Sequence, residues 1–466
     1  MLRSLYSAVS GVKGHQTYLD VTGNNIANVN TVGFKRDVLH FRDMIYQSAK
    51  NPSAPNSAIP IGGVNPAQVG LGTQVGSIEH VFTQGSLQST GIPTDMAISG
   101  EGFFVVQNGG QTLYTRAGNF ALDRDGNLVM QGNGYMVQGY EYDENLKEFA
   151  TSLSNVNIPI GQKIPAKATT LVSLRCNLCS TASIYTAGPS GDPGIEVANT
   201  WATKADVYDS KGTKYTMEVA FRKTAENEWA YKAYFVSEDG KIYDGTDPEY
   251  PDLIDPTTPS SGTMVFNADG LLKEVKDSSG VVQSGGALKF KSKFSEFGAD
   301  DTEITIDFRG DVTEENTKVP KEDSGLDGVT QYDSPSTTKI YYQDGYTMGT
   351  LENWSVSQTG IITGTYSNGQ TQQLAKVALA MFANSGGLLK VGETCFAETV
   401  NSGMAQIGSP MEGGAGSVQG NTIEMSNVDL SEEFVNLIRA QRGFQANTRV
   451  VTTSDQVLEE LINMKR

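Results

Sequence analysis

The two ends of the chain carry the same narrow apolar pattern, and this pattern constrains the fold more than any other feature. Near each end, apolar residues recur at alternating steps of three and four, and no proline interrupts residues 429–466. Such spacing is typical of a coiled-coil-like α-helix. We therefore predict one helix over roughly 3–28 and a second over 429–466, with Asp429 and Glu432 forming a capping box at its start. The stripe residues are Leu2, Leu5, Val9, Val12, Leu19, Leu430, Phe434, Leu437, Phe444, Val451, Leu458 and Ile462.

Two interpretations of the stripes are open. The helices could form a hairpin that closes one globular domain, or they could bury their stripes against other copies of the chain. Residues 51–78 carry no charge and are rich in proline and glycine, and a glycine-rich stretch follows residue 408. Because these segments resemble linkers that separate the helices from the rest of the chain, the second interpretation is favoured.

Between the two linkers the apolar period changes from that of a helix to that of a strand. Short apolar runs such as "FFVVQ" (103–107) are broken by Gly, Asn and Asp, which is typical of β-hairpins. We predict a mainly β protein with long terminal α-helices and nested, discontinuous β domains. The expected parts are an inner helical polymerisation domain (1–40 and 426–466), linkers (41–78 and 408–425), a first β domain (79–160 and 336–407) and an inserted outer β domain (161–335).

Composition excludes several kinds of partner. The net charge of −18 and the pI near 4.7 argue against binding to nucleic acid or to an anionic membrane surface. The sequence contains no run of about 18 apolar residues, so we predict no membrane-spanning segment. Three cysteines are too few for a secreted disulfide framework, and no cleavable signal opens the chain. We expect the protein to remain in the cytoplasm or to leave by a route without a cleaved signal.

Residues that could support catalysis are scarce. His15, His40 and His80 lack a nearby Cys or His at metal-ligand spacing. The stretch "DRDGN" (123–127) resembles a calcium loop, but the later acidic ligands are missing, so a tight turn is expected there. We predict no metal, no cofactor and no turnover activity.

Four stretches resemble the flagellar axial proteins, the family that builds the bacterial rod and hook. They are "GNNIANVNTVGFKR" (23–36), "GSLQSTGIPTDMAISGEGFFVVQ" (85–107), "YTRAGNFALDRDGNLV" (114–129) and the C-terminal stretch 426–464. The long insertion, roughly 161–335, resembles the extra outer domain of the hook members. A long rod-like relative is the alternative, and a β-domain surface adhesin is a weaker one. The residues of the first motif are Asn24, Asn25, Asn28, Asn30, Thr31, Gly33 and Phe34.

The resemblance implies a structural role. It implies a curved tubular homopolymer that acts as a universal joint and transmits torque from motor to filament. It also implies export through the flagellar type III apparatus, and rod, hook-cap and hook–filament junction proteins as partners. The contacts inside the tube would map onto residues 2–30 and 429–466.

The stretch "LVSLRCNLCS" (171–180) holds two of the three cysteines, Cys176 and Cys179. From the residues alone, the pair could be half of a zinc site, a redox pair or disulfide, or two small buried hydrophobes on a strand. None of these interpretations is excluded by the sequence.

The resemblance adds a fourth interpretation for Cys176. Hook proteins of periplasmic flagella join neighbouring subunits through lysinoalanine, in which a cysteine followed by asparagine loses its sulfur and a lysine of the next subunit adds to it. Cys176-Asn177 matches that pair, and Lys163, thirteen positions upstream, matches the expected lysine, with Lys167 as its rival. The attacking amine must be neutral, and a cationic neighbour such as Arg175 would favour that form. The resemblance therefore implies a covalent crosslink and a periplasmic location.

Overall fold

The computed structural model describes residues 2–52, 63, 65–143, 146–184, 200–237, 240–243, 252–283, 286–310 and 328–464. The chain divides into two compact units, each made of separate chain segments. Unit 1 comprises residues 1–160, 352–365 and 371–466, and unit 2 comprises 161–351 and 366–370. The predicted class, mainly β with a helix at each end and β units that are discontinuous in sequence, is confirmed.

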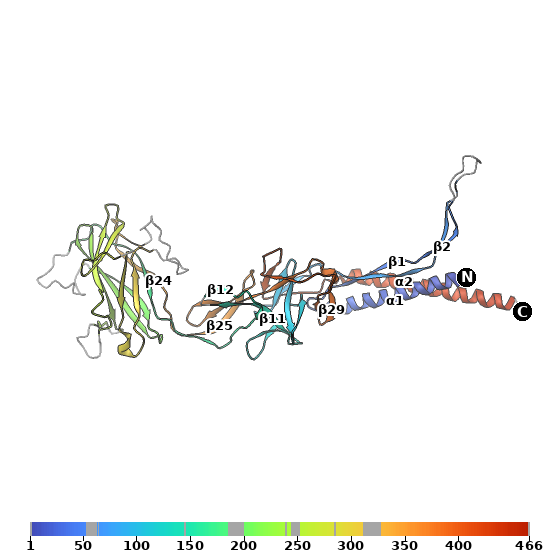
Figure 1. Ribbon diagram of the computed structural model, residues 1–466, viewed down its shortest axis with the longest axis horizontal. Helices are drawn as coiled ribbons and strands as arrows, with labels where there is room; N and C mark the ends of the chain where they lie inside the picture. Colours follow the sequence, from blue (N-terminus) through green and yellow to red (C-terminus); the bar gives the residue numbers. More distant parts are fainter. Residues whose placement is uncertain are drawn as a thin grey trace. The chain divides into compact units, whose positions relative to one another are not determined.

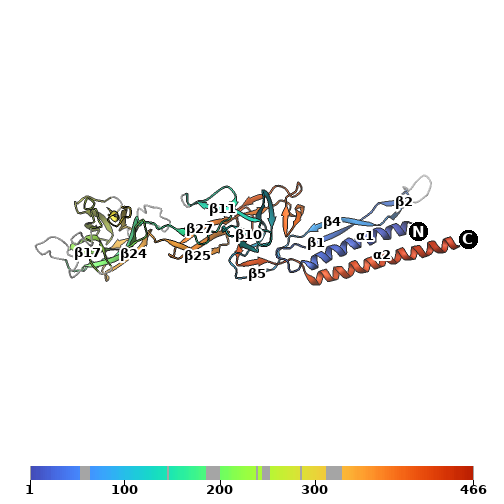
Figure 2. The same cartoon turned by 90° about the horizontal axis from the view of Figure 1, so that it is seen from below.

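The two terminal helices are α1 (Leu2–Ala27) and α2 (Leu430–Met464), close to the predicted bounds. They lie side by side in both views and bring the two termini to the same end of unit 1 (Figures 1 and 2). The Asp429 carboxylate caps α2 by accepting hydrogen bonds from the N–H groups of Ser431 (2.8 Å) and Glu432 (3.4 Å). The Glu432 carboxylate does not complete the predicted box but pairs with Arg36 at 2.6 Å.

The segments expected to be linkers contain strands where the structure describes them. Strand β1 (Asp37–Asp43) pairs antiparallel with β4 (Thr73–His80), and β2 (Tyr46–Lys50) pairs with β3 (Ala67–Gly70). Residues 53–62 and 64 lie outside the described part. Further on, β32 (Ser417–Gly420) pairs with β6 (Met96–Ser99), and β33 (Thr422–Glu424) pairs with β5 (Leu87–Ser89). Interspersed β-branched residues such as Val75 and Ile78 favour extended backbone despite the many glycines.

The main sheet of unit 1 contains strands from both halves of the chain. Its central order is β27-β11-β7-β8-β30-β29, with β26 beside β27. Phe103, Tyr114, Leu388 and Phe396 are buried in the core of this sheet. The strands are β7 (Phe103–Asn108), β8 (Gln111–Thr115), β9 (Phe120–Leu122), β10 (Leu128–Met130), β11 (Met136–Asp143), β12 (Glu148–Phe149), β13 (Ser154–Asn155), β26 (Ile361–Tyr366), β27 (Thr371–Val377), β28 (Leu379–Met381), β29 (Leu389–Gly392), β30 (Cys395–Ala397) and β31 (Gln406–Gly408).

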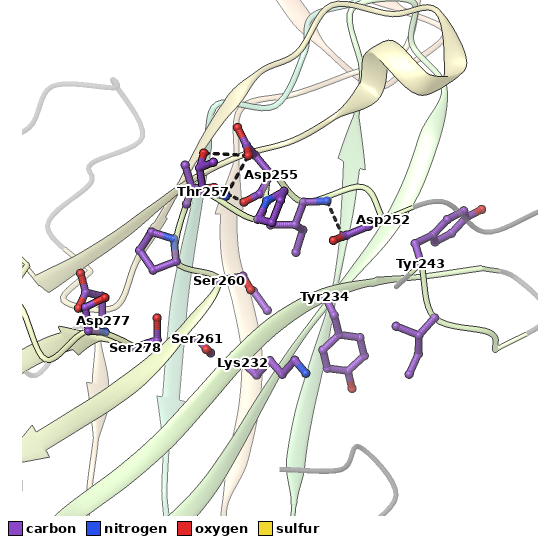
Figure 3. Close-up of a pocket in the computed structure, with 17 residues that line it drawn as sticks. Lys232, Tyr234, Tyr243, Asp252, Asp255, Thr257, Ser260, Ser261, Asp277 and Ser278 are labelled. Carbon is purple, nitrogen blue, oxygen red and sulfur yellow. Dashed lines mark hydrogen bonds between the residues drawn. The ribbon is translucent and has the colours of Figure 1, made fainter. Parts of the chain in front are cut away.

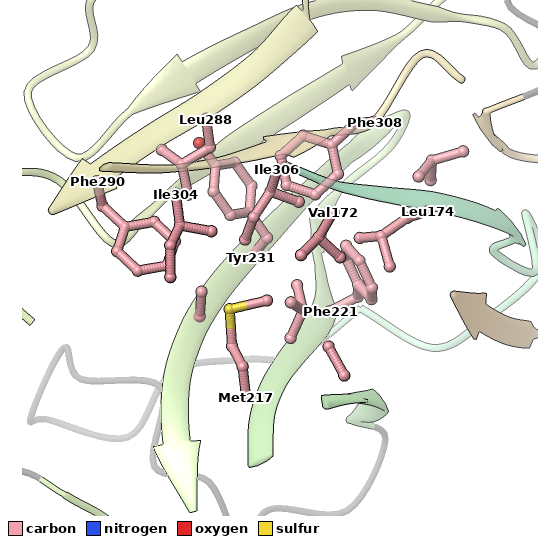
Figure 4. Close-up of a cluster of buried hydrophobic side chains, with 14 of the residues drawn as sticks. Val172, Leu174, Met217, Phe221, Tyr231, Leu288, Phe290, Ile304, Ile306 and Phe308 are labelled. Atoms are coloured by element: carbon pink, nitrogen blue, oxygen red, sulfur yellow. The ribbon is translucent and has the colours of Figure 1, made fainter. Parts of the chain in front are cut away.

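Unit 2 is built on two sheets that share one apolar core (Figure 4). The first sheet has β15 (Leu171–Asn177) at its centre. Strand β15 pairs in parallel with β22 (Glu303–Asp307) and β23 (Val329–Thr330), and antiparallel with β24 (Thr337–Gln343). Strand β21 (Ala287–Lys291) pairs with the far edge of β22. The second is an antiparallel meander of β16 (Trp201–Tyr208), β17 (Lys214–Ala225), β18 (Glu228–Val236), β19 (Ser261–Phe266) and β20 (Leu272–Asp277). The short strand β14 (Lys163–Ile164) pairs antiparallel with the start of β25 (Gly349–Val356), which also neighbours β26.

The expected turn at residues 123–127 is confirmed. The Asp123 carboxylate accepts hydrogen bonds from the N–H groups of Asp125 (2.9 Å) and Asn127 (2.8 Å), which is how an aspartate closes a turn. Among the described residues there is no group of three His, Cys, Asp or Glu side chains arranged to hold a metal ion. Within the same ranges, no helix is both long and apolar enough to span a membrane.

Candidate assembly surface and crosslink site

The face of α1 that is buried within the chain is small and polar. It differs from the predicted apolar stripe, whose members Leu5, Val12 and Leu19 are half-buried and whose Val9 is 38% exposed. The side chain of Leu2 lies outside the described ones. The residues of the buried face are Ala8, Gly11, Gly14, Thr22 and Asn25.

Two glycines set how closely α1 and α2 approach. A Cβ atom on Gly11 would lie 2.8 Å from the Asn447 side chain, and one on Gly443 would lie 2.4 Å from the His15 ring. Residue numbers rise along one helix as they fall along the other, so the helices are antiparallel. The missing side chains let the backbones approach, and polar groups fill the space that remains. The closest described approaches of the two helices are therefore made by glycines against polar side chains, while other residues of the buried face, such as Gly14, lie against β1.

The stripe of α2 is only partly covered. Leu437, Phe444, Val451 and Leu458 are half-buried. At the two ends of the helix, Leu430, Phe434 and Ile462 are exposed to 41%, 53% and 67%. The structure contains features of both interpretations of the apolar stripes. The two helices pack against each other, as in a hairpin, and they still leave much of their apolar surface uncovered within one chain.

The motif asparagines near the end of α1 have different roles. The buried Asn25 side chain donates to the Asp37 carbonyl (2.8 Å) and accepts from the Asp37 N–H (3.0 Å), which fastens β1 to the helix. Asn28 donates to the Asn24 carbonyl (2.9 Å) and accepts from the Thr31 hydroxyl (3.1 Å), closing the C-terminal turn of the helix. Asn30 is exposed.

Gly33 and Phe34 lie where the chain leaves the helix. Gly33 has a φ of +67°, and its N–H donates to the Glu424 carbonyl at 2.8 Å. A Cβ atom there would lie 2.4 Å from the backbone nitrogen of Ala117, so only glycine fits. Phe34 is buried, and the Lys390 ammonium lies 4.2 Å from the centre of its ring.

A buried charge cluster beside this motif was not predicted from the sequence. Lys35 donates to Glu424 (2.6 Å) and to the Thr83 carbonyl (2.9 Å), and both charged side chains are fully buried. The Arg116 guanidinium lies 3.5 Å from the other oxygen of Glu424. Burial lowers the pKa of Lys35, and the Glu424 carboxylate works against that shift. The cluster joins chain segments from both ends and from the β core of unit 1.

Cys176 lies on β15 with its side chain in the core between the two sheets of unit 2. The thiol is free, and burial raises its pKa to about 12. Its neighbour Asn177 faces the opposite side of the strand, where its amide donates to the Ser334 hydroxyl (2.8 Å) and accepts from the Tyr332 N–H (2.9 Å). Asn177 therefore fixes the turn that precedes β24 against the end of β15.

Cys179 is a free, half-buried thiol 3.2 Å from the Thr181 hydroxyl, so the two cysteines form no disulfide. Arg175 is on the face of β15 opposite Cys176, and its guanidinium lies 3.4 Å from the centre of the Tyr341 ring. In the β15–β24 pair Arg175 lies opposite Lys339, and its effect on a lysine of another subunit stays a prediction.

The two candidate lysines differ in their surroundings. Lys163 is an exposed residue of β14, opposite Thr350 of β25. The Lys167 ammonium lies 3.6 Å from the buried Asp344 carboxylate, and the Lys167 side chain is 46% exposed. Both lysines and Cys176 belong to unit 2.

Unit 2 also contains an open groove of about 680 Å³, lined by Lys232, Tyr234 and a run of Ser, Thr and Pro residues (Figure 3). Its three aspartates are occupied in closing turns: Asp252 accepts from the Ile254 N–H, Asp255 from Thr257, and Asp277 from the Ser279 N–H. These hydrogen bonds hold the pKa of Asp255 below its usual range. In the described part of the groove, the three carboxylates therefore serve to close turns.

Comparisons with known proteins agree with this architecture. The chain matches family models for the flagella basal body rod protein (5–35), the flagellar hook protein FlgE/F/G D1 domain (97–173), the flagellar basal body protein FlaE D2 domain (177–346) and the flagellar basal body rod FlgEFG protein C-terminal region (419–464). It is 40% identical to the flagellar hook proteins FlgE of Borreliella burgdorferi and Treponema pallidum, over the full length of all three chains. The crystal structure of the Helicobacter pylori hook protein FlgE2 has a similar fold, with a TM-score of 0.51 and 16% identity over 72% of this chain and all of that one.

The paired terminal helices and the discontinuous β units define a flagellar axial protein. Identity over the whole chain narrows this class, and the chain belongs to the flagellar hook protein FlgE family. It is thus a structural subunit of the flagellar hook, and neither the rod-like nor the adhesin alternative is favoured.

Proposed function

We propose that the chain forms the hook by burying the exposed stripes of α1 and α2 against neighbouring copies. The observation that carries this proposal is the incomplete cover of the stripes within one chain: glycines and polar side chains make the closest helix contacts, and the exposed stripe residues are Val9, Leu430, Phe434 and Ile462. Apolar surface of this extent, rimmed by polar residues, is typical of an interaction site. An open helical array of identical contacts supplies partners for every stripe.

The assembled tube acts as a curved universal joint that passes torque from the motor to the filament. Its ends meet the rod, the hook cap and the hook–filament junction proteins, and the subunits arrive through the flagellar type III export apparatus. The two-unit construction supports a joint that bends, because polar β surfaces can shift against one another with less cost than a fused apolar core.

Assembly can be tested by placing a charge on the uncovered stripe. Phe434→Asp should leave the folded subunit intact, because this side chain is 53% exposed, and should abolish polymerisation measured by sedimentation and electron microscopy. Glu460→Gln on the same helix, exposed and on a face away from the stripe, is the matched control and should polymerise normally. Normal polymers of Phe434→Asp would contradict the proposed interface.

We also propose that assembled subunits become covalently joined through residue 176. A base removes the Cα proton of Cys176, the Cβ–S bond breaks, and hydrosulfide leaves to give dehydroalanine. The neutral amine of a lysine in the next subunit then bonds to Cβ, its surplus proton is lost, and Cα is reprotonated. The net change is the loss of H₂S, and no oxidant is required.

Two features around Cys176 support this chemistry. The Thr330 hydroxyl lies 3.4 Å from the Cys176 carbonyl oxygen, where a donor stabilises the negative charge that develops when the Cα proton leaves. Cys176 pairs on one side with Thr338 of β24 and on the other with β23, which contains only two residues and therefore opens more readily than the longer strand. Opening is necessary, because the Cys176 side chain is buried in the folded subunit.

Lys163 is the proposed partner, and the match to hook proteins of periplasmic flagella also suggests a periplasmic location. The test is mass spectrometry of protease digests of assembled hooks. A peptide pair joined through residue 176 and Lys163, resistant to reductant and lighter by one H₂S, is expected. Separate peptides with an intact Cys176 thiol would refute the crosslink and leave the proposed helical interface untouched.

A further inference from the structure

Asp344 lies where the two chain segments that lead into unit 2 run side by side. Its carboxylate accepts three hydrogen bonds, from the N–H groups of Thr170 (2.8 Å) and Leu171 (2.9 Å) and from the Thr170 hydroxyl (2.6 Å). The backbones of Lys167 and Tyr346 exchange two hydrogen bonds just beyond it, at 3.0 and 3.1 Å. This bonding fixes the Asp344 carboxylate in position and orientation.

The fixed carboxylate pairs with the Lys167 ammonium at 3.6 Å. The Asp344 side chain is 2% exposed, so water screens its charge poorly on the buried side. The ion pair ties Lys167 to its own subunit. Among the described residues Lys163 forms no ion pair, and its side chain is exposed on the two-residue strand β14.

We propose that Asp344 selects the lysine that forms the crosslink: it holds Lys167 back and leaves Lys163 to react. This inference rests on the proposed crosslink at residue 176. The bond-forming step needs an amine that can reach another subunit, and the Asp344 carboxylate holds the Lys167 ammonium within its own chain. Asp344 is thus a specificity-determining residue that takes no part in the chemistry.

The decisive comparison uses hooks assembled from Lys163→Arg and from Lys163→Arg with Asp344→Asn, digested and analysed by mass spectrometry. Arginine keeps the charge at position 163 but does not add to dehydroalanine. The asparagine carbonyl still accepts from the two backbone N–H groups, and its amide can donate to the Thr170 hydroxyl. The single variant should show little linkage, and the double variant should show a Lys167-linked peptide raised about fivefold, the upper range for a partly exposed ion pair.

A matched control replaces Asp344→Asn with Asp255→Asn, which removes the same charge from another turn-closing carboxylate and should leave Lys167 unlinked. If the double variant with Asp344→Asn remains unlinked while the wild type is joined through Lys163, the selection by Asp344 is refuted and the crosslink stands. Wild-type hooks joined mainly through Lys167 would also refute the selection. Wild-type hooks with no linked peptide would refute the crosslink itself, and the inference with it.

A second variant tests the same idea without disturbing Asp344. Thr350 lies opposite Lys163 in the β14–β25 pair, so Thr350→Asp places a carboxylate beside that lysine. The Lys163-linked peptide should fall severalfold in Thr350→Asp hooks and should not change in Thr350→Asn hooks. Equal linkage in both variants would show that a neighbouring carboxylate does not restrain the lysine, which would overturn the proposal.

Discussion

Replacing Asn25 tests whether the first motif fastens β1 to α1. The Asn25 side chain is 1% exposed, and it satisfies both the N–H and the carbonyl of Asp37. Asn25→Ala removes these two hydrogen bonds and leaves two backbone groups without that partner. At about 1–2 kcal/mol for each group, the free energy of unfolding of unit 1 should fall by about 2–4 kcal/mol.

Asn30 provides a matched control in the same motif, because it is the same residue type and its side chain is exposed. Asn30→Ala should change the free energy of unfolding by less than about 0.5 kcal/mol. Both variants can be compared by guanidinium unfolding followed by circular dichroism at 222 nm, which reports on the helices of unit 1. Equal losses for the two variants, or a loss below about 1 kcal/mol for Asn25→Ala, would refute this role for Asn25.

Two further predictions follow from the structure. Gly443→Ala should lower the melting temperature of the helices, because the new Cβ would lie 2.4 Å from the His15 ring and overpacking costs about 1–3 kcal/mol. Gly23→Ala is the control: a Cβ there meets nothing within 4 Å, so this variant should stabilise the protein by about 0.5–1 kcal/mol. A lower melting temperature for Gly23→Ala than for Gly443→Ala would contradict the proposed helix contact. For Cys176, burial raises the thiol pKa from 9.0 to about 12, so the folded state keeps a proton that the unfolded state loses. The free energy of unfolding should therefore fall between pH 9 and 12, by up to about 1.4 kcal/mol per pH unit. Cys176→Val should remove that component of the pH dependence. Identical pH profiles of unfolding for the wild type and Cys176→Val would show that the thiol is not buried.

The helices and the β character of the middle could be predicted because both depend on local periodicity. Heptad spacing gave helix bounds within two residues of α1 and α2, and alternation around glycine-rich turns gave strands. The glycine- and proline-rich composition of residues 51–78 predicted a linker without regular structure. Strands β3 and β4 nevertheless form there, because they satisfy their backbone groups by pairing with β2 and β1.

Two features of the site could not be predicted. Gly11, on the buried face of α1, lies against Asn447 of α2, and a search for apolar spacing does not find such a contact. Lys35 and Glu424 are 389 residues apart, and no local pattern in a single sequence can pair charges at that separation. For Cys176, the family resemblance suggested the crosslink, and the fold shows that the thiol is buried on a strand, one of the interpretations that the residues alone had left open.

The central claim is that the stripe left exposed in one chain is covered by other copies in the hook. It is tested most directly by thiol labelling of Phe434→Cys, in a Cys179→Ser background, before and after polymerisation. The account predicts rapid labelling of residue 434 in the monomer and strong protection in the polymer, while Ala440→Cys, at a position that is fully buried, should resist labelling in both states. Equally rapid labelling of residue 434 in monomer and polymer would contradict the account.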